Sequence, residues 1–252
     1  MRPHRGSPRS QAARPAAPAA RGPVLGFDTA TPDTVVALTV GGAEPLELRH
    51  APAPGDRPGH AAQLLALAHA LLDRAGLRFA DVDRIGVGVG PGTFTGLRIG
   101  VATARALAQG TGAQTVPVST LRALAAAAGH DGPVLAVLDA RRGEAFVAAY
   151  RGGDELLAPA AVTPEELPRL VRGRPEPPGT WLAVGDGAVA FRDQLEPVAI
   201  AVPADGHPSH RVSAVAICRL ASSVAPIARD ALVPDYVRLP DAEETRLRRA
   251  RG

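Results

Sequence analysis

Two segments of the sequence predict the same order of strands and turns. Residues 24–40, VLGFDTATPDTVVALTV, are typical of a strand, a tight turn and a second strand, and residues 134–150, VLAVLDARRGEAFVAAY, have the same shape. Each hairpin carries an aspartate near the end of its first strand, Asp28 and Asp139, at a separation of about 110 residues. Because a tandem duplication implies two similar lobes, it restricts the fold more than any other feature of the chain.

The elements that follow the two hairpins also match. In the first unit the sequence predicts a third strand at PLELRHA, a helix over 60–75, a strand at RIGVGVGPG, a helix over 95–109 and a short strand at AQTVPV. The second unit has DELLAPAAVT, a weaker helix from Pro164, WLAVGDGA, a helix over 188–195 and VAIAV. The order β-β-β-α-β-α-β therefore occurs twice. This is the pattern of the α/β actin-like, sugar-kinase-like ATPase fold, whose two lobes face a common cleft; chance repetition of an α/β pattern is the alternative.

We expect four regions along the chain. These are an extension over residues 1–22, a first lobe over 23–116, a second lobe over 117–240 that includes a C-terminal helix, and a polar tail over 241–252. Residues 1–22 contain five arginines, no acid and no apolar run, so we expect a disordered extension and not a secretory signal. Without both ends the formal charge of +3 becomes about −3, which argues against a basic nucleic-acid groove across the folded body.

The helices predicted over 60–75 and 95–109 are apolar on more than one side. One sheet covers only one side of a helix, so the sequence predicts a second layer, either the neighbouring helix or another protein. Small residues recur every fourth position at Gly96, Gly100, Ala104 and Ala108, which permits close helix packing, and ordinary packing within the chain is the alternative. Our candidates for a partner interface are Leu64, Leu67, Leu71, Leu97, Arg98, Gly100, Val101, Ala104, Arg105 and Ala108.

The stretch GVGVGPGTFTGLRIG has the shape of a phosphate-binding turn without its chemistry. A P-loop requires a lysine, and the chain contains no lysine. The dinucleotide pattern fails as well, because GVGVGPG lies within a strand and no acidic ribose ligand follows. The free backbone amides at the start of the helix could still bind an anion. The alternative is that Thr93 or Thr95 only caps the helix. Our candidates for a cleft or nucleotide site are Asp28, Thr29, Gly90, Gly92, Thr93, Thr95 and Asp139.

A search for catalytic and metal-binding patterns finds none. The seven histidines include no HxxxH or HExxH pair, and no GxSxG sequence is present. The single cysteine, Cys218, lies in an apolar run, which predicts a buried thiol and excludes an internal disulfide. No stretch is long and apolar enough to predict a membrane span. We therefore expect no catalytic residues, no bound metal, no intrinsic cofactor and a cytoplasmic location.

The chain closely resembles the bacterial TsaB (YeaZ) family. The motifs that carry the resemblance are LGFDTAT, GVGVGPGTFTGLRIGVATARALA, VPVSTLRALA, VLDARRGEAF and PDYVRLPDAE, which together span Val24 to Glu243. The resemblance implies the actin-like fold and membership of the complex that forms N6-threonylcarbamoyladenosine beside the anticodon of tRNAs reading codons that start with A. It also implies a heterodimer with the related catalytic subunit TsaD through the first-lobe helices. The ATPase TsaE is an implied partner through the complex, with ATP or ADP possible there.

The sequence departs from the catalytic relatives at one place. In TsaD-like proteins the strand after the glycine-motif helix leads to an HxxxH pair that binds the metal, whereas this chain reads VSTLRA over 118–123. Hydroxyl and guanidinium groups do not replace two imidazoles as ligands of a transition metal. The leading hypothesis is a non-catalytic subunit, which when isolated is a monomer or a homodimer. The alternatives are a stand-alone ATP-dependent enzyme or glycoprotease-like metallopeptidase, and a nucleotide-sensing module.

Overall fold

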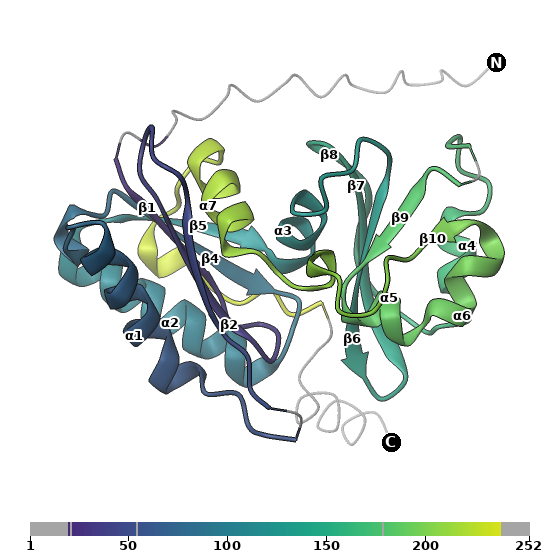
Figure 1. Cartoon of the computed structure of the whole chain (residues 1–252), viewed down its shortest axis with the longest axis horizontal. Helices are drawn as coiled ribbons and strands as arrows, with labels where there is room; N and C mark the ends of the chain where they lie inside the picture. Colours follow the sequence, from purple (N-terminus) through teal and green to yellow (C-terminus); the bar gives the residue numbers. More distant parts are fainter. Residues whose placement is uncertain (1–19, 21, 54, 178, 238–252) are drawn as a thin grey trace, which may run out of the picture.

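The computed structural model describes residue 20 and residues 22–53, 55–177 and 179–237. Its strands form two five-stranded sheets, with the orders β3-β2-β1-β4-β5 and β10-β9-β6-β7-β8. When the second order is read in reverse, each strand occupies the position of its counterpart in the first sheet. The tandem duplication and the two-lobed fold predicted from the sequence are confirmed (Figure 1).

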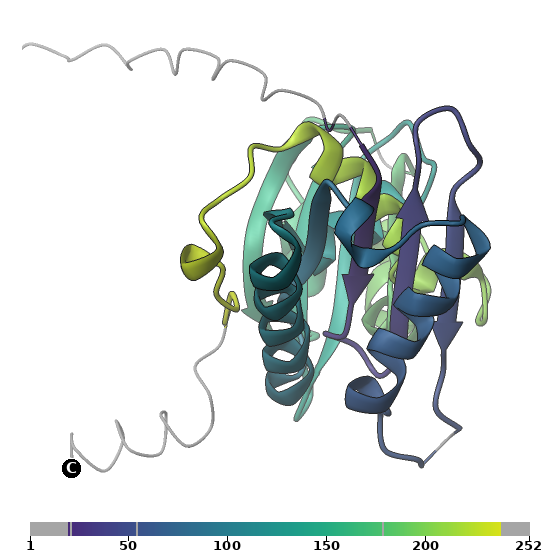
Figure 2. The ribbon, with the colours of Figure 1, turned by 90° about the vertical axis from the view of Figure 1, so that its left-hand side faces the viewer.

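The first lobe has its most buried strands at its centre. Every residue of β1 (Val24–Asp28) and β4 (Arg84–Gly90) is buried, because sheet neighbours flank both strands and helices cover both faces. The outer face carries α1 (His60–Arg74) and α2 (Phe94–Thr111), which lie side by side in Figure 2. The remaining strands of this sheet are β2 (Thr34–Thr39), β3 (Leu46–His50) and β5 (Gln114–Ser119).

The second lobe repeats this arrangement with shorter helices. Its strands are β6 (Val134–Arg141), β7 (Glu144–Arg151), β8 (Asp154–Val162), β9 (Trp181–Val184) and β10 (Ile200–Ala201). Its helices are α4 (Leu167–Val171), α5 (Asp186–Ala190) and α6 (Arg192–Leu195). The helix predicted over 188–195 is therefore two short helices that meet at Phe191, and the helix predicted from Pro164 begins three residues later. Short 3-10 helices cover Phe79–Asp81, Glu196–Val198, Pro208–His210 and Arg229–Ala231.

The last helix of each unit packs on the sheet of the other unit. Helix α3 (Thr120–Ala126) follows β5 of the first sheet and lies between the sheets, mainly against β6 and β7 of the second and also against β4 and β5 of the first. Helix α7 (Ala214–Ser223) follows the second sheet and packs against β1, β2, β4 and β5 of the first. Gly26 and Gly86 pair in register beneath α7, and a Cβ on them would come within 2.6 Å of the Cys218 sulfur and 2.7 Å of the Ala221 Cβ. Two glycines thus let α7 lie directly on the sheet.

This exchange changes the expected domain division. The boundary predicted between residues 116 and 117 falls inside β5, and β5 belongs wholly to the first sheet. The helix expected as the C-terminal helix of the second lobe is α7, which covers the first sheet. We propose a division after Ser119, with α3 and α7 as exchanged helices. The tail over 241–252, and the extension over 1–22 apart from Ala20 and Gly22, lie outside the described residues.

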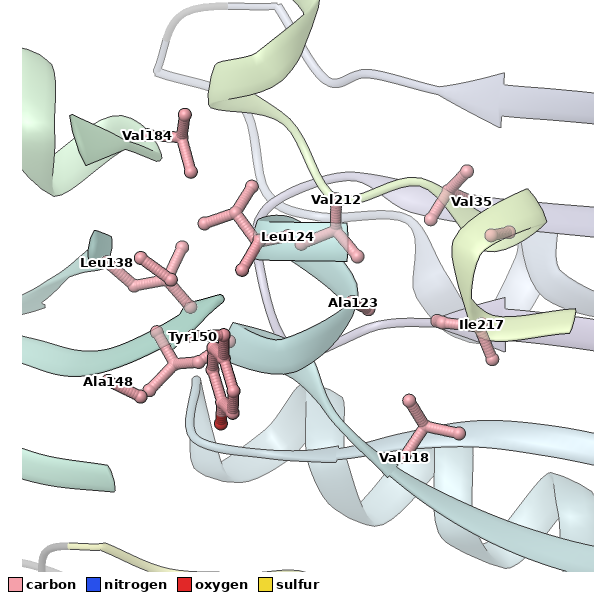
Figure 3. Packing of buried hydrophobic residues seen from close by; sticks show 14 of the residues in the cluster. Val35, Val118, Ala123, Leu124, Leu138, Ala148, Tyr150, Val184, Val212 and Ile217 are labelled. Carbon is pink, nitrogen blue, oxygen red and sulfur yellow. The ribbon is translucent and has the colours of Figure 1, made fainter. Parts of the chain in front are cut away.

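One of the three hydrophobic clusters formed by the described residues joins the two lobes. One cluster of buried side chains contains Val35 and Val118 of the first lobe, Leu124 of α3, and Leu138 and Tyr150 of the second lobe. Figure 3 shows Leu124 and Ala123 between the residues of the two sheets, with Ile217 of α7 on the first-lobe side. This close-packed cluster is continuous from one lobe to the other.

Candidate functional site

A small cavity between the lobes carries opposite charges that pair with each other. It is a cavity of about 200 Å³ lined by residues that include Asp33, Asp186, His210 and Arg211. Asp33 of the first lobe binds Arg211 at 2.7 Å and Arg49 at 2.8 Å, and Arg49 also binds Glu47 at 3.3 Å, so both arginines have carboxylate partners. This volume is below the range of roughly 300–1,000 Å³ that is usual for ligand pockets.

The second-lobe side of the cleft is acidic. The Asp139 amide donates to the Asp186 carboxylate at 3.0 Å, which places the two acids side by side. Desolvation raises the pKa of Asp186, and the charge of Asp139 adds to the increase. Asp139 also binds Arg141 at 3.4 Å. The second-lobe side of the cleft thus carries two neighbouring carboxyl groups, and Asp139 stays a candidate cleft residue.

Asp28, the first candidate for the cleft, is completely buried. Its carboxylate accepts hydrogen bonds from the Ala30 amide at 2.8 Å and from the Thr120 hydroxyl at 2.9 Å. A Cβ on Gly88 would overlap its Oδ2 atom, so Asp28 fills the space beside a glycine of β4. The expectation of a cleft carboxylate is therefore corrected: Asp28 ties β1 to the start of α3, and no solvent-facing oxygen remains for a metal or nucleotide.

The glycine turn after β4 is also occupied by the chain itself. The Thr93 amide donates to the Ala30 carbonyl at 2.7 Å, and the buried Thr29 hydroxyl donates to the Gly96 carbonyl at 2.7 Å. A Cβ on Gly92 would overlap the Ala30 carbonyl oxygen, and one on Gly90 would meet that of Asp235. Of the nucleotide candidates in this turn only Thr93 and Thr95 are exposed. The glycines thus provide close packing of the backbone.

Replacing Asp28 with asparagine is expected to preserve the fold and to remove one source of pH dependence. Burial raises the pKa of Asp28 above its ordinary value. The folded state therefore holds this proton more tightly than the unfolded state, and its free energy of unfolding falls as pH rises from about 4 through the folded pKa. Asparagine accepts from Ala30 and donates to Thr120, so Asp28→Asn should be at least as stable as the wild type at pH 7. Urea unfolding across this pH range measures both effects; a large loss at pH 7 would contradict them.

The predicted ridge of small residues faces the interior and not a partner. Ala104 is 0% exposed and Ala108 is 7% exposed, and a Cβ on Gly100 would come within 2.6 Å of the Thr29 hydroxyl. These positions pack inside the first lobe, so the prediction that this ridge forms a protein–protein contact is wrong. Further candidates buried in the same lobe are Leu64, Leu71, Leu97 and Val101; Leu67 and Arg105 are half-buried, and Arg98 is exposed.

A second stripe of small residues does face outward. On α1, Ala62 and Ala66 are exposed and Ala70 is half-buried; on α2, Ala102, Ala106 and Gly110 are exposed. On each helix these small residues are four positions apart, so they lie along one side of that helix. Leu65, 47% exposed, and the half-buried Ile99 flank them. We call this surface the docking face; it consists of Ala62, Leu65, Ala66, Ala70, Ile99, Ala102, Ala106 and Gly110.

A groove of about 580 Å³ runs along the side of α2, between this helix and the segment 229–236. Tyr236 stacks on the exposed ring of Phe94 at a centroid distance of 5.3 Å, and the Arg98 guanidinium lies 3.8 Å above the same ring. We call the groove beside α2 the arginine groove. It is lined by Arg98, Val101, Ala102, Arg105, Ala106, Gln109, Arg229, Asp230, Pro234 and Tyr236.

The described residues form neither a metal-binding cluster nor a membrane-spanning helix. Within this part of the chain, no three His, Cys, Asp or Glu side chains are grouped so that they could hold a metal ion. No helix in it combines the length and apolar character needed to cross a membrane. Cys218 is buried, and burial raises the pKa of its thiol to about 12, so the thiol is not a nucleophile near neutral pH.

The duplicated sheets, the cleft between them and the glycine turn define the class: the chain has the actin-like ATPase fold, with two βββαβα lobes. The TsaD family of tRNA N6-adenosine threonylcarbamoyltransferases matches residues 57–192. The tRNA threonylcarbamoyladenosine biosynthesis protein TsaB of Escherichia coli is 33% identical over 68% of this chain and 74% of its own length. Its Bacillus subtilis counterpart is 31% identical over 74% of this chain and 83% of its own length. The solved structure of YeaZ from Pseudomonas aeruginosa is 28% identical, with a TM-score of 0.72 over 85% of this chain and 99% of that chain.

The chain therefore belongs to the TsaB (YeaZ) family of tRNA threonylcarbamoyladenosine biosynthesis proteins. Sequence reasoning identified the two helices that carry the outer surface, and the exposed Arg98, but missed the small residues that face outward. The signal was present: Ala62, Ala66, Ala102 and Ala106 have the same spacing as the buried ridge.

Proposed function

We propose that the chain is a non-catalytic subunit of the complex that forms N6-threonylcarbamoyladenosine in tRNA, and that it supports a catalytic TsaD subunit by binding it. The observation that carries this proposal is the docking face, an exposed apolar surface on the two first-lobe helices. The TsaB names of the relatives and the TsaD-like segment over 57–192, which includes both helices, support the pathway and the kinship with TsaD.

Three features argue that the chain does not catalyse the transfer itself. One hydrophobic cluster joins the lobes, the glycine turn is filled by Thr29 and Ala30, and Asp28 is buried against Thr120. Thr120 also belongs to the segment where the family resemblance implies a histidine pair in TsaD-like proteins, and here its hydroxyl donates to Asp28. The chemistry of acyl transfer, and any need for ATP or ADP, then falls to the other members of the complex.

The docking face suits a partner built of similar helices. Alanine and glycine at a spacing of four let two helix backbones approach closely. A related chain of the same fold presents a matching pair of helices, so two pairs join as a four-helix layer. The same surface suits a second copy of the chain when TsaD is absent. We place this assembly in the cytoplasm with its tRNA substrate, and the ATPase TsaE joins it through the complex.

Replacing Ala66 with arginine is expected to block TsaD binding and leave the fold intact. Ala66 is exposed, so the isolated chain tolerates a longer side chain, whereas a packed helix layer does not accommodate its volume and unpaired charge. We expect a loss of at least about 2 kcal/mol of association free energy. Titration calorimetry with purified TsaD measures the affinity, and circular dichroism monitors the fold.

The matched control is Ala190→Arg, which places the same side chain on an exposed helical position of the second lobe. It should bind TsaD like the wild type. Normal binding by Ala66→Arg would remove α1 from the interface. Metal- or ATP-dependent turnover by the purified chain alone would favour the stand-alone enzyme, and nucleotide binding without turnover or partner would favour the nucleotide sensor.

A further inference from the structure

The arginine groove carries more positive charge than its own residues neutralise. Three guanidinium groups line it, and Asp230 is its only acidic lining residue among the described part of the chain. Asp230 is shared between Arg105 at 3.5 Å and Arg229 at 3.2 Å, and its side chain is 75% exposed. Among the described residues, Arg98 contacts two neutral groups, the Tyr236 hydroxyl and the Phe94 ring. Asp235 is exposed on the same segment but does not line the groove.

The groove and the docking face share a wall. Ala102 and Ala106 line the groove and are exposed on the outer side of α2. A protein that packs on these alanines therefore covers the mouth of the groove and takes its arginines out of water. Removing charges from water is costly unless opposite charges from the partner meet them.

We propose, on the basis of the docking proposed above, that the arginine groove receives an acidic segment of the TsaD-like partner. Carboxylates of that segment bind Arg98, Arg105 and Arg229, and the bidentate geometry of guanidinium groups favours carboxylates. A second copy of the chain fits less well, because it brings the same surplus of positive charge. The groove thus selects the heterodimer over self-association, while the docking face supplies the apolar contact.

The test is a charge reversal at Arg105, whose side chain is 41% exposed. Arg105→Glu should weaken the binding of purified TsaD by about tenfold or more, because it places like charges opposite each other. The affinity of the wild type should fall between about 50 mM and about 500 mM NaCl, and that of the variant should change less. Arg169→Glu, on an exposed position of α4, makes the same change in net charge and should bind normally.

The outcomes separate this inference from the docking proposal. If Ala66→Arg blocks TsaD binding while Arg105→Glu and Arg229→Glu bind normally, the docking face stands and the acidic segment is excluded. If Arg105→Glu leaves TsaD affinity unchanged but weakens tRNA binding by the complex, the groove serves RNA and the inference is overturned. Deletion of residues 238–252, which include Asp241, Glu243 and Glu244, tests the chain's own tail as the occupant. The same residues also include five arginines and are basic overall, so we expect unchanged TsaD binding after this deletion. Tighter binding would mean that the chain's own tail occupies the groove and would overturn the inference.

Discussion

Gly96→Ala should destabilise the protein by more than about 3 kcal/mol, because the new methyl group has no space. A Cβ at this position would overlap the carbonyl oxygen of Thr29 and come within 2.6 Å of the Thr93 hydroxyl oxygen. It would also disturb the hydrogen bond from the Thr29 hydroxyl to the Gly96 carbonyl, which fixes the start of α2 on β1. Urea unfolding followed by circular dichroism measures the loss.

Gly110→Ala is the matched control, on the same helix and with the same added methyl group. No atom lies within 4 Å of a Cβ built on Gly110. Alanine favours a helix interior over glycine, so this variant should gain about 0.5–1 kcal/mol. Equal unfolding midpoints for the two variants would contradict the contact between Thr29 and α2.

Arg84→Met should lower the free energy of unfolding by about 3–5 kcal/mol. Arg84 is 2% exposed on β4, and its guanidinium donates to the carbonyls of Ala221 at 2.8 Å, Ser222 at 3.2 Å and Val224 at 3.3 Å. These groups form the C-terminal end of α7, where a positive charge also favours the helix dipole. Methionine has a similar length but leaves the carbonyls without this donor.

Arg219→Met makes the same substitution at an exposed position of α7 and should change the stability by less than about 0.5 kcal/mol. Arg84→Lys, which keeps the charge but not the planar set of donors, should fall between the two. A thermal and urea unfolding series on the three variants distinguishes these effects. If Arg84→Met matched Arg219→Met, the guanidinium would not be holding the end of α7.

The sequence predicted the local elements well because each hairpin and helix is encoded by residues close together in the chain. The order of strands, the duplication and the outer pair of helices were all available from periodicity. The prediction of one helix over 188–195 was less accurate, because the apolar pattern did not show the break at Phe191. The exchange of α3 and α7 could not be predicted from the sequence either, since apolar periodicity shows that a helix is covered but not which sheet covers it.

Which candidate residues face water could not be predicted from the sequence, for a related reason. A helical wheel groups the residues that share a side but does not say which side faces water. On α2, Gly100 and Ala104 have the same spacing as Ala102 and Ala106, yet the first pair is buried and the second is exposed. The burial of Asp28 depends on Gly88 in a neighbouring strand and on Thr120, which is 92 residues away. Such contacts arise only after the chain has folded.

The exchanged helix α7 has a consequence for how the protein is made. The N-terminal part of the chain leaves the ribosome first, so β1 to β5 are complete when residue 119 has emerged. One face of that sheet still lacks α7, which begins at Ala214. Its apolar residues then stay uncovered while nearly a hundred more residues are synthesised, and exposed sheet surface of this kind promotes aggregation. Slow translation between these points should therefore increase the demand for chaperones, and a released fragment that ends before α7 should be insoluble.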